Sequence, residues 1–127
     1  MRVIIKRIIN LEQGYNVAFS SEYGNATAIW NGAEPQINKE YFVEIEVSGV
    51  LLWQKDISVT DIECKIEEMD NGVVYLSGVL ESIEDDGYTV IKIGDSIVAI
   101  ETQGVPPVIN SCIKLVAKNI ALYEVNY

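Results

Sequence analysis

The sequence contains no histidine. Without an imidazole the chain cannot build serine–histidine or cysteine–histidine catalytic pairs, histidine-containing metal sites or the usual proton shuttle near neutral pH. It also lacks a G-x-S-x-G elbow, a phosphate-binding loop and a dinucleotide fingerprint. We therefore expect no enzymatic activity, no catalytic residues and no cofactor, although a site made from carboxylates alone stays open.

Cysteine is scarce, since Cys64 and Cys112 are the only two and each stands alone on an apolar stretch. Isolated cysteines cannot form the usual paired-cysteine zinc site, and we expect two buried, reduced thiols. The acidic turn 84–86 lacks the alternating oxygen ligands of a calcium-binding loop. We expect it to be a solvated hairpin tip, and we expect no metal site.

Long apolar runs are missing, so the sequence predicts no membrane span. The first residues, 1–7, include basic side chains but no sustained apolar region before a cleavage site. We interpret them as the start of a first strand rather than as a signal peptide, which makes the cytoplasm the expected location.

Basic residues are few: nine lysines and arginines face 19 aspartates and glutamates, giving a net charge of −10. Residues 54–72 are the most acidic stretch, with two basic and six acidic side chains. Such a field repels phosphate backbones, so nucleic acid is a disfavoured partner. It suits a basic protein partner, and it also keeps a protein soluble.

The residues that are present favour strands. Tyr41, Val43, Ile45 and Val47 alternate with polar residues, a pattern typical of a half-buried strand that continues past a bulge at Gly49. In the stretch 3–11 the alternation places four apolar side chains on one face: Val3, Ile5, Ile9 and Leu11.

Two short motifs predict hairpins. Asn71-Gly72 should join a strand over 62–67 to one beginning at Val73, and Gly94-Asp95 should form a tight turn between two later strands. A short helix over 60–68 is an alternative for the first of these segments. Residues 54–61 are the most linker-like part of the chain.

The chain also repeats itself. The segment Gly-Ala-Glu-Pro-Gln-Ile-Asn at 32–38 matches Gly-Val-Pro-Pro-Val-Ile-Asn at 104–110, with an offset of 107 − 35 = 72. Two weaker matches, 12–15 with 85–88 and 50–53 with 120–123, occur in the same order. Ordered matches at a nearly constant offset indicate a duplicated unit.

We therefore predict an all-β fold with little or no helix, made from two tandem duplicated Greek-key barrel units that pack together. Residues 1–53 would form the first barrel repeat, 54–72 an acidic connecting strand or linker, and 73–127 the second repeat. The order of strands in each unit resembles the small barrels of the OB-fold kind. Whether the repeats share one barrel or form two stays open.

The second unit is also loosely similar to the TOBE and Mop-type domains of transport ATPases and molybdate-binding proteins. The likeness lies in residues 78–80, 91–94 and 114–122. It implies a small-ligand or oxyanion site, for which Lys92 and Lys114, with Lys118, are the available donors. The serine-alanine-arginine-asparagine entry motif of Mop domains is missing, so no ligand residues carry over.

Six residues are candidate partner-binding residues. An acidic belt between the units provides either a docking surface for a basic partner or a charged strand edge that prevents strand addition. Trp30, beside a glycine loop, is the candidate for an exposed aromatic contact. Trp53 and Tyr123 end matched strands and are expected to plug the barrels. The acidic belt comprises Asp61, Glu63, Glu67, Glu68 and Asp70.

The leading hypothesis for function is a non-enzymatic acidic module that acts through protein–protein contacts, as an inhibitor, immunity-type protein or regulatory subunit. Alternatives are an OB-like binder of single-stranded nucleic acid, which would stack bases on aromatic side chains, and an oxyanion-binding domain. Homodimerisation also stays open, since the strand over 41–47 could pair with a second copy if it lies at an edge.

Overall fold

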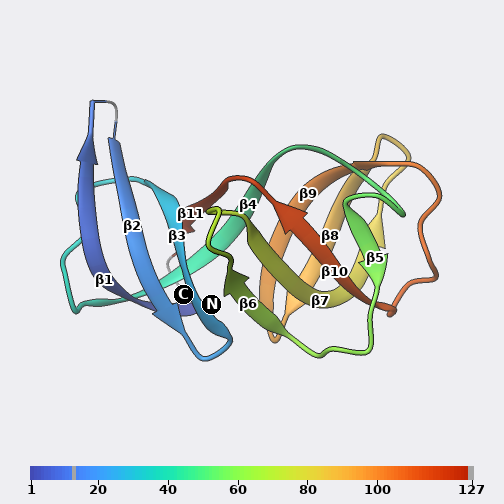
Figure 1. The fold of residues 1–127 in the computed structure, drawn as a ribbon, viewed down its shortest axis with the longest axis horizontal. Helices are drawn as coiled ribbons and strands as arrows, with labels where there is room; N and C mark the ends of the chain where they lie inside the picture. The colour runs from blue at the N-terminus through green and yellow to red at the C-terminus, as the bar shows by residue number, and fades with distance from the viewer. Residues whose placement is uncertain (13, 126–127) are drawn as a thin grey trace.

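The computed structural model describes residues 1–12 and 14–125, and within these ranges it contains strands and turns but no helix (Figure 1). The all-β prediction is confirmed. Gln13, which belongs to one of the repeated motifs, lies outside the described residues. The strands are β1 (Arg2–Leu11), β2 (Gly14–Ser21), β3 (Gly24–Asn31), β4 (Glu40–Leu52), β5 (Ile57–Val59), β6 (Lys65–Glu68), β7 (Val74–Ile83), β8 (Tyr88–Ile93), β9 (Ser96–Gln103), β10 (Cys112–Ala117) and β11 (Ile120–Glu124).

These strands form one mixed sheet in the order β1-β2-β3-β11-β4-β9-β8-β7-β10-β5, with β6 on β7. Two pairings between strands, β3 with β11 and β4 with β9, are parallel. Both pair a strand of the first half of the chain with a strand of the second half. Such distant partners are compatible with parallel pairing, which needs a long connection between the two strands. The two halves are therefore interleaved in space.

The sheet curls into two lobes (Figure 1). In the left lobe β1 also pairs with β4, so β1, β2, β3, β11 and β4 close a ring of hydrogen-bonded strands. The right lobe contains β9, β8, β7, β10 and β5, together with the C-terminal part of β4. The buried side chains of both lobes belong to one hydrophobic cluster.

Strand β4 connects the lobes. Tyr41, Val43, Ile45 and Val47 are all buried, as the alternating pattern predicted. The register with β9 shifts between Glu46 and Val50, around the predicted bulge at Gly49. Because β4 pairs with β1, β11 and β9, it is not an edge strand. The hypothesis that this strand pairs with a second copy is therefore wrong.

Strand β1 departs from simple alternation. Val3 and Ile5 are fully buried, but Ile9 and Leu11 are exposed. The register with β2 shifts between Ile5 and Arg7, and an extra residue in a strand turns the following side chains to the opposite face. The prediction of a single apolar face was wrong for this reason. Strand β7 has a similar shift, against β8, between Leu80 and Ser82.

The two matched loops have the same local structure. The amide of Asn38 donates to the carbonyl of Ile5 at 2.7 Å, and the amide of Asn110 donates to the carbonyl of Leu80 at 2.8 Å. Both asparagines adopt a left-handed backbone, with φ of 66° and 75°. Asparagine tolerates this conformation better than most residues, which explains its presence in both copies of the motif.

The closing strands also have matching registers, but one position away from the sequence match. Leu122 of β11 lies opposite Trp30, and Leu51 of β4 lies opposite Thr102. Counted at the loop offset of 72, residue 30 corresponds to residue 102, so these two registers give Leu51 and Leu122 matching positions. Trp53 is buried as expected, but Tyr123 is 39% exposed, so its predicted role as a plug was wrong.

The segment between the matched motifs packs against both lobes. Residues 57–59, predicted as part of a linker, form β5 and pair with β10. The strand expected over 62–67 is shorter, because β6 begins at Lys65, and the turn around Gly72 joins it to β7 as predicted. Ile66 donates its amide to the carbonyl of Tyr23, which attaches β6 to the β2–β3 turn.

The tip of the β2–β3 hairpin fits closely against its neighbours. A Cβ at Gly24 would overlap the Ile66 carbonyl oxygen, and a Cβ at Gly94 would overlap the Tyr23 hydroxyl. The predicted tight turn at Gly94-Asp95 is confirmed, since Ile93 pairs with Ser96. This contact joins the two lobes near the middle of the molecule.

We predict that Gly24→Ala lowers the free energy of unfolding by at least about 2 kcal/mol more than Gly14→Ala does. Both glycines have positive φ, 142° and 122°, but no atom lies within 4 Å of a Cβ at Gly14. The second variant therefore reports backbone strain alone, about 1–3 kcal/mol. Urea unfolding of the two variants measures the difference, and equal losses would contradict the close contact with Ile66.

Tyr23 gives a prediction for alkaline pH. Burial raises the pKa of its hydroxyl above the ordinary value of 10.0, and the nearby negative charge of Glu22 adds to this effect. The folded state therefore holds this proton more tightly than the unfolded state, and stability falls as the pH rises above about 10. Urea unfolding across this range should show a shallower fall for Tyr23→Phe, and identical slopes would contradict the assignment.

Candidate functional site

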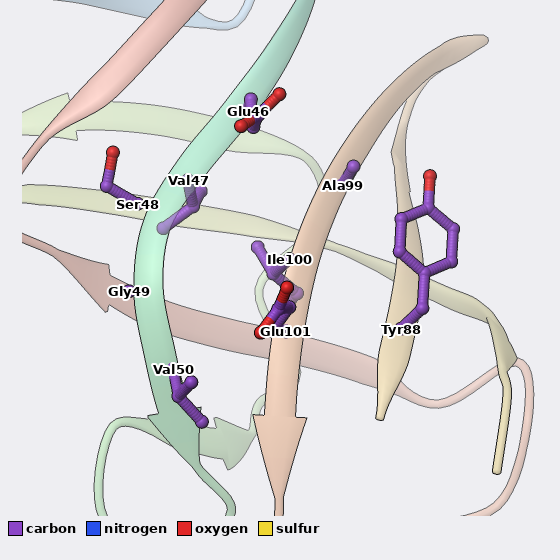
Figure 2. A pocket seen from close by; sticks show the side chains of 9 residues that line it. All are labelled: Glu46, Val47, Ser48, Gly49, Val50, Tyr88, Ala99, Ile100 and Glu101. Carbon is purple, nitrogen blue, oxygen red and sulfur yellow. The ribbon is translucent and has the colours of Figure 1, made fainter. Parts of the chain in front are cut away.

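A groove opens on the outer surface where β4 and β9 separate (Figure 2). Its volume is about 480 Å³, and it follows from the register shift between Glu46 and Val50. Gly49, with φ of 84°, supplies the backbone conformation that the shift requires. The groove is therefore a property of the backbone pairing rather than of a flexible loop.

The groove is acidic and partly aromatic. Figure 2 shows Glu101 beside β9 on the side facing β4, Glu46 farther along β4, and Tyr88 across β9. In the sheet, Glu101 pairs with both Tyr88 and Val50. No lysine or arginine lines the groove. Two carboxylates beside a tyrosine ring and an apolar side chain suit a cationic group carried on an aliphatic stem.

The groove continues into a broader outer face. Ala99, Glu46, Ala121 and Ile29 are successive neighbours across β9, β4, β11 and β3, so their side chains share one side of the sheet. Tyr123 lies beside Glu44 in the adjacent row. The outer face thus mixes glutamates with exposed apolar and aromatic side chains, a composition compatible with a protein interface.

Trp30, the predicted exposed contact, is only 3% exposed. Its indole N–H donates to the Ala33 carbonyl at 2.8 Å, and its ring meets the Tyr41 ring edge-on with centroids 4.9 Å apart. The loop after β3 folds back over the indole, a contact that the sequence position beside Gly32 did not reveal. Trp30 therefore anchors the loop from the inside, and the expected exposure was wrong.

The acidic belt divides into two parts. Glu68 accepts hydrogen bonds from the amide of Thr27 at 3.1 Å and from its hydroxyl, and Glu67 pairs with Lys65 at 3.0 Å. These two glutamates therefore have local partners on β3 and β6. Asp61, Glu63 and Asp70 are exposed on the connecting segments. A partner-binding role for the belt stays a prediction.

The lysines considered for an oxyanion site have partners of their own. Lys92 pairs with Glu81 at 3.2 Å, and the ammonium of Lys114 lies 4.6 Å from the centre of the Tyr75 ring. Lys118 is exposed near the turn before β11. The structure therefore gives no support to a set of convergent cationic donors.

The cysteines lie on opposite flanks of β7. Cys112 pairs in register with Val79, whereas Cys64 precedes β6 and accepts a hydrogen bond from the Gly94 amide at 3.1 Å. Both thiols are free and partly exposed rather than buried, and both line one surface pocket together with Gly78 and Val79.

Residues 1–12 and 14–125 contain no group of three or more histidine, cysteine, aspartate or glutamate side chains placed to hold a metal ion. Nor do these residues form any helix with the length and apolar character needed to span a membrane. Comparisons with protein-family models, with curated proteins and with solved structures each found no match.

Sequence reasoning missed the groove residues Glu46 and Glu101, and it considered Tyr88 only as one of several aromatic side chains that could stack on bases. The available signal was a strand with outward glutamates interrupted by Gly49. The partner strand β9 lies about fifty residues away in the chain, and nothing in either segment specifies that they pair.

We predict that Trp30→Phe lowers the free energy of unfolding by about 1–3 kcal/mol, because it removes the hydrogen bond to Ala33 and leaves a small cavity. Tyr123→Phe is the control, since the Tyr123 side chain is partly exposed. Urea unfolding should show little change for this control. A Trp30→Phe variant as stable as the wild type would contradict the anchoring role.

Proposed function

We propose that this protein is a non-enzymatic binding module that recognises a lysine or arginine side chain of a protein partner in the β4–β9 groove. The observation that carries this proposal is the placement of Glu46 and Glu101 in one groove beside Tyr88. An inhibitor, an immunity-type protein and a regulatory subunit are all roles that such a module fits.

The physical basis is charge complementarity combined with apolar contact. The net charge of −10 attracts a basic partner from a distance and raises the association rate. In the groove, the aliphatic stem of a lysine or arginine would lie along Val50 and Tyr88 while its cation meets the carboxylates. The surrounding outer face, with Tyr123 and Ile29, would supply the apolar contact area.

We also infer that the scaffold consists of two OB-like Greek-key units that exchange their last strands. The left ring has the strand order β1-β2-β3-β11-β4, and β11 is the strand in it that comes from the second half of the chain. The C-terminal part of β4 has the equivalent place beside β9. The matched loops and the matched registers at 30 and 102 support this interpretation.

The test uses an arginine-glycine repeat peptide as the probe. We predict that Glu46→Gln with Glu101→Gln weakens its binding at least tenfold, because both carboxylates lose their charge. The control variant, Glu12→Gln with Glu34→Gln, makes the same change in net charge at two exposed residues outside the groove. Glu12 lies in the turn after β1, and Glu34 lies in the loop after β3. Calorimetry or fluorescence anisotropy at low salt measures the difference.

Equal weakening by both double variants would show that only net charge matters, and the groove would then not be the site. Binding of a glutamate-glycine repeat peptide as tight as that of the basic probe would reject cation recognition altogether.

A further inference from the structure

A second surface, at the far end of the right lobe, is strongly apolar. Val59, Val105 and Val108 are 65%, 75% and 78% exposed, and Ile109 lies beside Val108. The loop 104–111 runs alongside β5 at this end (Figure 1). The side-chain amide of Gln54 donates a hydrogen bond to the Val105 carbonyl near one end of the loop, and the backbone amide of Thr60 donates one to the Cys112 carbonyl near the other end. We call Val59, Val105, Val108 and Ile109 the end surface.

The matched loop 32–38 exposes Ile37 as loop 104–111 exposes Ile109, but it shows that the turn does not require an apolar residue at position 108. Both loops tuck their shared proline inward, so Pro35 is buried and Pro107 is partly buried. The position of Val108 is filled in the other loop by Gln36, which is also exposed. The same turn and the same asparagine hydrogen bond form in both. The turn and its hydrogen bond therefore do not require an apolar residue at position 108.

Negative charge flanks the end surface. Asp61 and Glu63 follow Val59 on exposed chain, and the loop 104–111 has no charged residue of its own. At the start of that loop, Gly104 and Pro106 line a pocket together with the acidic turn 84–86. A ligand that covers the apolar residues would therefore meet negative charge at both ends of the loop.

A second copy of the chain fits this surface poorly. Four side chains offer much less than the roughly 800 Å² that each partner of a standard complex buries. Two copies would also each bring a net charge of −10. A short segment of another protein needs less area and can supply the opposite charge.

We propose that the end surface is a docking site for a short extended segment of a partner protein, with apolar side chains over Val59 and Val108 and a basic residue facing Asp61 and Glu63. This site is separate from the β4–β9 groove, and it gives two residues of the acidic belt a binding role. An apolar centre with a charged margin is the usual composition of such sites.

The experiment selects twelve-residue peptides from a random display library on the wild-type protein and measures the enriched peptides by fluorescence anisotropy. We expect them to combine apolar residues with lysine or arginine. Val108→Gln should weaken binding at least tenfold, because it replaces an apolar contact with the residue found in the matched loop. Val59→Thr is a second variant on a different element, and Asp61→Asn with Glu63→Gln should weaken binding and reduce its salt dependence.

The control is Ile37→Gln, which changes an exposed apolar residue of the matched loop and should leave peptide affinity unchanged. Glu46→Gln with Glu101→Gln should also leave it unchanged, so failure of the groove proposal and failure of this one are distinguishable. No enrichment, enrichment of acidic peptides, or binding unaffected by both valine variants would overturn the proposal. Concentration-dependent dimerisation in sedimentation that Val108→Gln abolishes would identify a second copy as the occupant and would also overturn it.

Discussion

The rest of the structure depends on the two parallel pairings, β3 with β11 and β4 with β9. Each places a segment of one half of the chain among strands of the other half. Leu122, fully buried in β11, and Leu51, buried in β4, carry apolar side chains into the common hydrophobic cluster. Neither half can complete its own set of strand neighbours, so we expect the two halves to fold and unfold together.

The same arrangement gives β4 two tasks. Its N-terminal part closes the left ring against β1, and its C-terminal part pairs with β9 in the right lobe. A strand that takes part in two separately curved lobes has to bend between them, and the register shift around Gly49 allows this bend. The proposed binding groove lies at this bend. The feature that allows the strand to join two lobes thus also leaves Glu46 and Glu101 beside an opening in the surface.

The two matched loops separate structural from functional sequence. Proline and asparagine occur at the same places in both, and they set the turn and its hydrogen bond to the first strand of each half. One outward position differs, with Gln36 in one loop and Val108 in the other, whereas the exposed Ile37 and Ile109 are the same residue. The residues that set the turn are therefore repeated, and the exposed position of Val108 is free to differ and can serve recognition.

The sequence by itself determined the strand content, the hairpin turns, the repeated loops and the buried face of Tyr41 to Val47, because these follow from local backbone preference and alternation. Tertiary structure decided the burial of Trp30, the exposure of Ile9 and Leu11, and the neighbours of β4 and β11. A one-residue shift reverses which face of a strand is buried, and the parallel partners are distant in the chain. Only packing of the whole chain settles such contacts, since no local pattern specifies which strand completes which lobe.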